Sequence, residues 1–336
     1  MNKKINWPLL AGVRFFLALI VLSEHLAWYI PETDITLKLA KFSALVAVLG
    51  FLVISGFSIA ASYEANKNRF YFRRGLRIIP IYVASIVFTI VVTEMKQPFD
   101  MVSLGSGIDF FGVVGNLFFM QGIFVGSLEG NPVLWTLMIE VFFYIMTPLI
   151  DKQRAWVLHA VVISVFFFIL QRYLGFYYYS QMEYGLGILF LGWAWLVGFW
   201  FYHNRNSSGA AFFLLSIGVV AIVINGYFAD YFALITWLLI CVSLCYGHLL
   251  KCPLPSVLNL SGDISYPIYV FHVPFFALIS FFNINNNGFI YCLMILLFCL
   301  CIDLFYDKPL KTLFKKWLIY RVGVKNERRK FNGSFK

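Results

Sequence analysis

Long runs of apolar residues, separated by short polar turns, make up most of this chain. A helix that crosses the hydrocarbon core of a bilayer needs about 20 predominantly apolar residues, because it rises about 1.5 Å per residue through about 30 Å. Ten runs meet this requirement, at about residues 8–30, 42–63, 76–95, 132–150, 154–173, 184–202, 209–226, 230–250, 264–283 and 287–306. We therefore predict an all-α polytopic membrane protein with about ten transmembrane helices.

A further apolar stretch, residues 108–125, is interrupted by Gly112, Gly115 and Gly122. Glycine inside a helix lowers its stability by about 1 kcal/mol relative to alanine. We therefore expect a re-entrant or interfacial segment here, not an eleventh membrane span.

The composition agrees with a membrane protein and excludes a soluble one. Apolar residues make up 61% of the 336 positions and charged residues only 12%, whereas a soluble domain carries about 25% charged residues. No stretch has enough polar surface to coat a soluble core. We expect a single membrane domain over residues 1–306, followed by a basic tail over residues 307–336.

The distribution of positive charge predicts the orientation in the membrane. Under the ten-span model, the loops on the side of the N-terminus, together with the tail, hold 21 Lys and Arg residues, and the opposite loops hold four. Cytoplasmic loops carry an excess of Lys and Arg. We therefore predict that both termini lie in the cytoplasm. The protein is expected to be a multi-pass protein of the inner (cytoplasmic) membrane.

The tail after Asp307 contains ten Lys or Arg residues and one acid, Glu327. It is predicted to lie beside the leaflet that is rich in anionic lipids, so adhesion to lipid headgroups is its expected role. The net charge of +10 does not indicate nucleic-acid binding. Topology accounts for the excess, and no basic module with interleaved aromatic residues occurs outside the membrane.

No other familiar chemistry is indicated by the sequence. The six cysteines lie in or beside apolar runs without C-x-x-C pairs, so neither a metal site nor a disulfide framework is predicted. Gly-rich phosphate loops and nucleophile elbows are absent from the sequence.

The first span contains Arg14, Glu24 and His25, although an ionisable group at mid-membrane costs at least about 2.5–3.5 kcal/mol. Arg14 and His25 are eleven residues apart, which is close to three helical turns, so they share one face. His25 is expected about 16 Å further along the helix, in the outer half of the membrane. Glu24 points elsewhere.

An arginine cluster precedes the third span, with Arg69, Arg73, Arg74 and Arg77 at its cytoplasmic mouth. Arg74 and Arg77 share a helix face, and guanidinium groups match phosphate oxygens. A phosphorylated ligand can therefore bind here. The alternative is ordinary anchoring by the positive-inside rule, which the spacing alone favours.

The run that begins at Trp135 carries Glu140 and, one turn later, Tyr144. Counting residues from the membrane surface puts Glu140 within about a turn of His25. The two side chains can then pair and hold the imidazole in one tautomer. A purely structural pair between helices explains the pattern equally well.

A last polar group puts Ser265, Tyr269 and His272 on one helix face, at spacings of four and three residues. A single histidine inside a membrane is more often structural than catalytic. The pattern by itself favours the structural role for His272.

Four motifs in this order resemble the acyltransferase-3 family of integral membrane acyltransferases. They are R-F-F-L-A-L-I-V-L-S-E-H, S-G-F with R-R-G-L-R-I-I-P, W-T-L-M-I-E-V-F-F-Y and S-Y-P-I-Y-V-F-H. The resemblance covers about residues 8–306 and implies ten helices. Positions that match the family's motifs are Arg14, His25, Arg74, Arg77, Trp135, Glu140, Tyr266, Tyr269 and His272.

The resemblance implies transfer of an acyl group, usually acetyl, from coenzyme A to a hydroxyl, often on a cell-envelope glycan or lipid-linked saccharide. Acyl-coenzyme A is then a donor substrate, and no permanently bound cofactor is expected. A sugar hydroxyl needs a base to remove its proton. We assign that role to His25, oriented by Glu140, with Arg74 and Arg77 on the coenzyme A phosphates and Arg14 along the passage.

Two alternatives stay open at this point. A proton-coupled transporter can use the same intramembrane Arg, Glu and His residues, although no second copy of the motifs indicates repeated halves. A flippase-like subunit would not need His25. Many relatives append an extracytoplasmic hydrolase-like domain that this chain lacks, so we expect the membrane unit to act alone, as a homo-oligomer or with a partner.

Overall fold

The computed structural model describes residues 4–31, 35–96, 109–175, 182–226, 230–250, 255–282, 287–314 and 316. These residues form helices and turns, with one isolated β-bridge between Gln121 and Val125. The α-helices are α1 (Trp7–Leu26), α2 (Ala44–Ala65), α3 (Phe70–Lys96), α4 (Phe110–Leu117), α5 (Trp135–Lys152), α6 (Val157–Leu170), α7 (Leu186–Asn204), α8 (Ser208–Asn225), α9 (Tyr231–Tyr246), α10 (Pro255–Phe281) and α11 (Gly288–Ile302). Short 3-10 helices are η1 (Ile35–Phe42), η2 (Pro132–Leu134), η3 (Arg154–Trp156) and η5 (Gly247–Leu249).

Nine helices in the described part of the chain are long and apolar enough to cross a membrane. The predicted all-α polytopic membrane fold is therefore confirmed. The fifth predicted span, residues 154–173, is shorter than expected, because η3 and α6 together run only from Arg154 to Leu170. The orientation of the termini stays a prediction.

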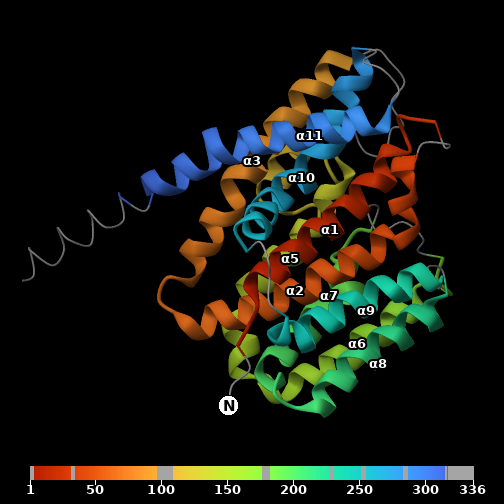
Figure 1. Cartoon of the computed structure of the whole chain (residues 1–336), viewed down its shortest axis with the longest axis vertical. Coiled ribbons are helices and arrows are strands. Elements are labelled where there is room, and N and C mark those ends of the chain that lie inside the picture. Colours follow the sequence, from red (N-terminus) through yellow and green to blue (C-terminus); the bar gives the residue numbers. More distant parts are fainter. Residues whose placement is uncertain are drawn as a thin grey trace, which may run out of the picture.

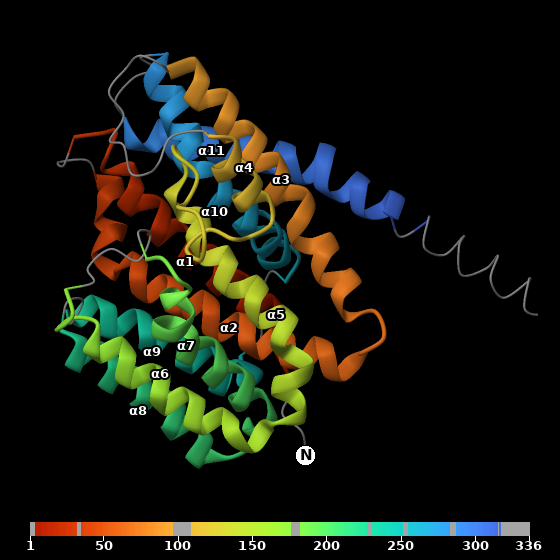
Figure 2. The same ribbon diagram turned by 180° about the vertical axis from the view of Figure 1, so that it is seen from behind.

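The helices α1 and α2 lie in the middle of the bundle (Figure 1). One group, α3, α10 and α11, lies on one side of them, and α6, α7, α8 and α9 lie on the other. Seen from behind, α5 crosses in front of α2, and α4 lies beside α3 (Figure 2). The most apolar 18-residue stretch of α2 is 94% buried, as expected for a helix that is hydrophobic on all sides.

Two glycines allow α2 and α7 to touch through their backbones. A Cβ atom on Gly56 would lie 2.0 Å from the carbonyl oxygen of Trp195, and one on Gly198 would lie 2.0 Å from that of Val53. Small residues at such crossings let membrane helices approach closely. We call this crossing the glycine seam.

Replacing Gly56 by alanine is therefore expected to destabilise the protein strongly. The added methyl group meets backbone atoms, which cannot rotate away as a side chain can. Overpacking typically costs about 1–3 kcal/mol, and we expect the free energy of unfolding to fall by about 3 kcal/mol or more. Thermal unfolding in detergent measures it. Gly126→Ala is the matched control, since a Cβ there has no heavy atom within 4 Å. Equal stability of the two variants would contradict the close crossing.

The segment before α5 enters the bundle. Helix α4 has eight residues, which span about 12 Å and cannot cross a bilayer. The chain then continues to η2, where Asn131 and Leu134 are fully buried. The Asn131 amide donates to Thr89 Oγ1 at 3.1 Å and to the Val270 carbonyl at 2.9 Å. Buried side chains also satisfy the irregular backbone, as is required inside a membrane bundle: the Leu134 carbonyl accepts from Gln121 at 2.8 Å, and the Leu128 amide donates to Asn116 Oδ1 at 3.2 Å. Re-entry of residues 108–125 into the membrane stays a prediction.

The last span runs past its predicted end. After α11, a π-helical segment, η6 (Asp303–Asp307), leads into further helix to Phe314. Asp303 and Asp307 are buried and pair with Lys308 and Lys311 respectively. Helix therefore continues into the predicted basic tail, and residues 317–336 of that tail lie outside the described residues.

Candidate active site

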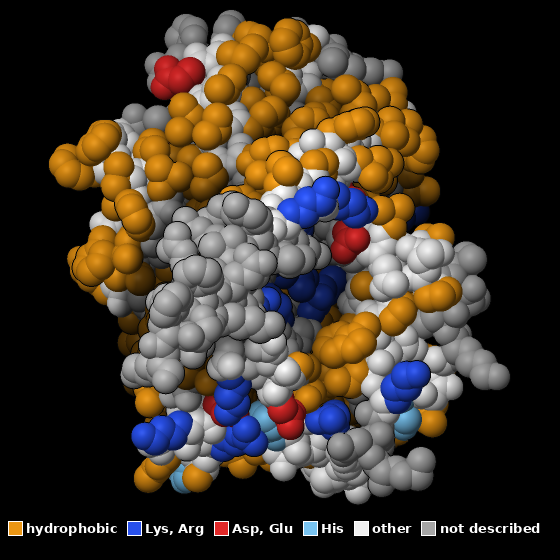
Figure 3. Space-filling view, turned by 90° about the vertical axis from the view of Figure 1, so that its left-hand side faces the viewer, with side chains coloured by type: hydrophobic (Ala, Val, Ile, Leu, Met, Phe, Trp, Pro, Cys, Tyr) orange, Lys and Arg blue, Asp and Glu red, His pale blue; other side chains and the backbone are white. Residues whose placement is uncertain are grey.

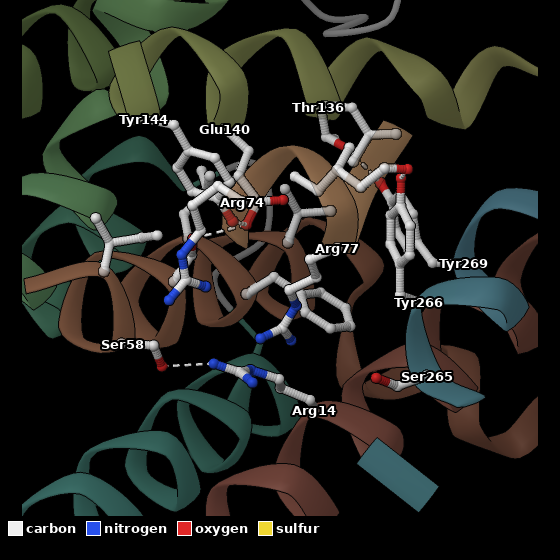
Figure 4. Close-up of a pocket in the computed structure, with 17 residues that line it drawn as sticks. Arg14, Ser58, Arg74, Arg77, Thr136, Glu140, Tyr144, Ser265, Tyr266 and Tyr269 are labelled. Carbon is white, nitrogen blue, oxygen red and sulfur yellow. Dashed lines mark hydrogen bonds between the residues drawn. The ribbon is translucent and has the colours of Figure 1, made fainter. Parts of the chain in front are cut away.

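A cavity with apolar walls and several charged and hydroxyl side chains lies between α1, α2, α3, α5 and α10 (Figure 4). Its empty volume, with its open mouth, is about 770 Å³. Polar and aromatic residues that line it are Arg14, Phe51, Ser55, Ser58, Arg74, Arg77, Thr136, Glu140, Tyr144, Ser265, Tyr266 and Tyr269. The structure thus brings together most of the residues that the sequence singled out, from four separate motifs.

Three guanidinium groups dominate one end of the cavity. Arg14, Arg74 and Arg77 point into the same space from α1 and α3 (Figure 4). On the side of the molecule that lies to the left in Figure 1, Lys and Arg side chains are recessed in a hollow (Figure 3). Glu140 is the one carboxylate among the lining residues. This excess of positive charge favours a ligand with more than one negative charge.

The arginines are incompletely satisfied by the described part of the protein. Arg14 donates to Ser58 Oγ at 2.5 Å, but Nε of Arg74 is buried without a hydrogen-bond partner. The guanidinium carbon of Arg74 lies 5.9 Å from the ring centre of Tyr144. Unused N–H donors beside an aromatic ring are suited to phosphate oxygens.

Two serines of α2 were not among the predicted site residues. Ser55 and Ser58 are three residues apart within the apolar part of α2, and both face the cavity. Ser55 donates to Glu140 Oε1 at 2.7 Å, and Ser58 accepts from Arg14. The signal was present, because a pair of hydroxyls on one face of a buried helix needs polar partners.

Glu140 does not pair with His25, so that part of the prediction is wrong. Its carboxylate accepts hydrogen bonds from Ser55 and from the Tyr144 hydroxyl. Helix α2 shows how deep Glu140 lies relative to His25. The amide of Ala44, at the start of α2, donates to Glu24 at 3.0 Å, beside His25. Ser55, which binds Glu140, lies eleven residues further along α2. Glu140 is therefore about 16 Å deeper than expected by helical rise.

The partner of His25 is His272. Nε2 of His272 lies 3.1 Å from Nδ1 of His25, and the ring centres are 5.0 Å apart. His272 is fully buried, whereas His25 is half-buried, with its ring edge-on to Trp28 at 4.7 Å. Neither histidine lines the cavity.

Tyr269 separates the cavity from the histidine pair. Its hydroxyl lies 2.8 Å from Thr136 Oγ1, and its ring packs edge-on against Phe51 with centres 5.6 Å apart. On the other side, its ring centre is 6.3 Å from that of His272. The cavity therefore ends one helical turn short of the two imidazoles.

The other aromatic candidates have different surroundings. Tyr266 lines the cavity and donates to the Ile78 carbonyl at 3.2 Å. Trp135, at the start of α5, is half-buried and outside the cavity lining. Tyr144 borders the arginines, as its contact with Arg74 shows.

Comparison with known proteins agrees with this arrangement. The family model for the acyltransferase domain of the acyltransferase-3 type matches residues 8–306, most of the chain. Searches among curated proteins and among solved structures gave no significant match. Every residue of the cavity and of the histidine pair falls inside the matched range.

Proposed function

Because the chain belongs to the acyltransferase-3 family of membrane acyltransferases, we propose that it transfers an acyl group, most simply acetyl, from acyl-coenzyme A to a hydroxyl. The acceptor is a cell-envelope glycan or a lipid-linked saccharide. The observation that carries the proposal is the cavity in which three guanidinium groups face one carboxylate. Coenzyme A presents several phosphate charges, which such a group of arginines can neutralise.

The donor is proposed to bind with its phosphates at the arginine end. Arg74 and Arg77 lie at the start of α3, on the side that the charge distribution assigns to the cytoplasm. The pantetheine arm then extends past Ser55 and Thr136 toward Tyr269. Phe51 and Tyr266 supply apolar walls for this thin chain.

Glu140 has a different proposed role from the one its sequence position suggested. It lies close enough to Arg14 and Arg74 to interact electrostatically with both. Its negative charge offsets part of the repulsion among the three cations in a low-dielectric site. Ser55 and Tyr144 fix its carboxylate, so Glu140 positions the arginines and does not orient the base.

The proposed chemistry is a direct transfer with His25 as general base. The imidazole takes the proton of the acceptor hydroxyl while that oxygen forms a bond to the thioester carbonyl carbon. The carbon–sulfur bond then breaks, and the imidazolium returns the proton to the departing thiolate. The products are an ester and free coenzyme A, and no further reactant is needed.

The thioester has to pass Tyr269 for this step. Tyr269 is held by Thr136 and Phe51, and both contacts can be exchanged by a side-chain rotation without unfolding a helix. The acceptor approaches His25 from the other end, where the half-buried imidazole lies beside exposed Trp28. The donor and acceptor therefore meet from opposite ends of the bundle.

Labelled acetyl-coenzyme A tests the proposal directly. Membranes that contain the protein are expected to transfer label to native envelope glycan and to release one free thiol per acetyl group. Membranes without the protein are the control. A purified protein that neither binds coenzyme A nor releases thiol with any envelope fraction would contradict the proposed donor. A proton-coupled transporter would give that result.

A further inference from the structure

His25 and His272 form a pair that links the first and the last of the helices around the site, α1 and α10. His25 is at the end of α1 and His272 is in α10, 247 positions later. Each neutral imidazole has one ring nitrogen with a hydrogen and one with a free lone pair. The hydrogen bonds of this pair are therefore informative about which nitrogen carries the hydrogen.

The hydrogen bonds assign one tautomer to each ring. Nδ1 of His272 lies 2.9 Å from the Ile268 carbonyl oxygen, which can only accept, so the hydrogen of neutral His272 is on Nδ1. Its Nε2 is then a lone-pair acceptor, and this atom faces Nδ1 of His25.

The same reasoning fixes His25. Its Nδ1 lies 2.9 Å from the Val21 carbonyl oxygen and 3.1 Å from Nε2 of His272. Both neighbours are acceptors, so Nδ1 carries the hydrogen and shares it between them. Nε2 of His25 is left with the free lone pair and is the nitrogen that can accept a proton.

We propose that His272 is a positioning residue: together with the Val21 carbonyl it accepts from Nδ1 of His25, and it fixes the orientation of that ring so that Nε2 is the base. This inference rests on the proposed function, in which His25 removes the proton of the acceptor. His272 occupies the place that a carboxylate takes in many catalytic histidine pairs. A neutral acceptor suits a fully buried site better, because a buried carboxylate would need its own partner.

The neighbours of the pair support a role in orientation. His272 packs against the rings of Tyr269 and Phe276, with centres 6.3 and 6.1 Å away. Its ring is thus fixed by aromatic contacts and by Ile268, and His25 in turn by Trp28. Neither imidazole forms a hydrogen bond to Asp or Glu within the described part of the chain. His272 is therefore the one side chain that, beside the backbone carbonyl of Val21, accepts from Nδ1 of His25 and holds its ring in place.

A matched pair of substitutions tests this role. Glutamine can place its amide oxygen close to the position of Nε2, so His272→Gln keeps an acceptor for His25, whereas His272→Leu fills the space without one. We expect kcat to be about 10- to 100-fold lower in His272→Leu than in the wild type, and to be close to the wild-type value in His272→Gln. KM for acetyl-coenzyme A should stay within about twofold, because the arginine cavity is untouched.

Three further measurements separate this role from a structural one. His159→Leu removes an exposed histidine and should leave kcat unchanged. Binding of coenzyme A and thermal unfolding in detergent report whether each variant is folded. The inference would be overturned if His272→Leu were less stable but had a normal kcat per folded molecule. It would also be overturned if kcat fell equally in His272→Leu and His272→Gln.

The variant His25→Ala distinguishes failure of this inference from failure of the proposed function. An inactive His25→Ala protein together with a fully active His272→Leu protein overturns the positioning role alone. A fully active His25→Ala protein overturns the assignment of the base, and the positioning role is lost with it.

Discussion

Replacing His25 by alanine is expected to lower kcat for acyl transfer by about 10²- to 10⁴-fold. This range is the usual contribution of a positioned general base. KM for acyl-coenzyme A should change little, since His25 lies outside the cavity that we assign to the donor. Initial rates of labelled acetyl transfer, measured per folded protein over a range of donor concentrations, give both constants.

The control for His25→Ala is His159→Ala, which removes an exposed imidazole on α6. It should transfer acetyl groups at the wild-type rate. Binding of coenzyme A to His25→Ala should also be normal, which shows that the donor site is intact. Transfer by His25→Ala at the rate of the control would contradict its role as the base.

Removing either Arg74 or Arg77 is expected to have the second largest effect. A hydrogen bond to a charged group contributes about 1.5–3 kcal/mol, so each alanine substitution should weaken binding of acyl-coenzyme A by about 10- to 100-fold. The increase should appear in KM, with a smaller change in kcat. Lysine should restore only part of the affinity, because it lacks the planar fork that matches phosphate.

The matched control is Arg69→Ala, one residue before α3 begins and outside the cavity lining. It removes one positive charge at the same end of the bundle without touching the cavity. Its effect on KM should be small and should disappear with added salt. Equal effects of Arg69→Ala and Arg74→Ala would indicate general attraction by the basic surface instead of a specific phosphate site.

The membrane fold could be predicted because it depends on local composition. Each span needs only a sufficient length of apolar residues, and nine of the described helices meet that requirement. The failure at α6 is informative. Residues 171–175 form turns after Leu170, so the predicted run was apolar for longer than it was helical.

The position of Glu140 could not be predicted because depth was counted from the wrong starting point. The count assumed that the fourth span begins at the membrane surface. Instead Asn131 and η2 are buried, and the Val133 carbonyl lies 3.3 Å from the Tyr269 hydroxyl. Helix α5 therefore begins at the level of Tyr269, inside the bundle, and Glu140 lies more than a turn deeper.

The pairing of His25 with His272 could not be predicted from the sequence either. Periodicity gives the face on which each histidine lies but not which helices are neighbours. Helices α1 and α10 are separated by eight other helices in the chain, and their contact depends on the whole bundle. By contrast, the grouping of Arg74 with Arg77 was predictable, because both lie on one helix within a single turn.

The glycine seam has a consequence for how the donor can enter. Backbone contact at Gly56 and Gly198 leaves α2 no freedom to slide against α7, so the cavity wall that α2 provides is immobile. The facing wall is formed by α3 and α5, and each has a proline inside the helix, Pro80 and Pro148, where a missing hydrogen bond permits bending. We therefore expect asymmetric access for the proposed donor, with α2 and α7 as a rigid support and with α3 and α5 bending to admit the ligand.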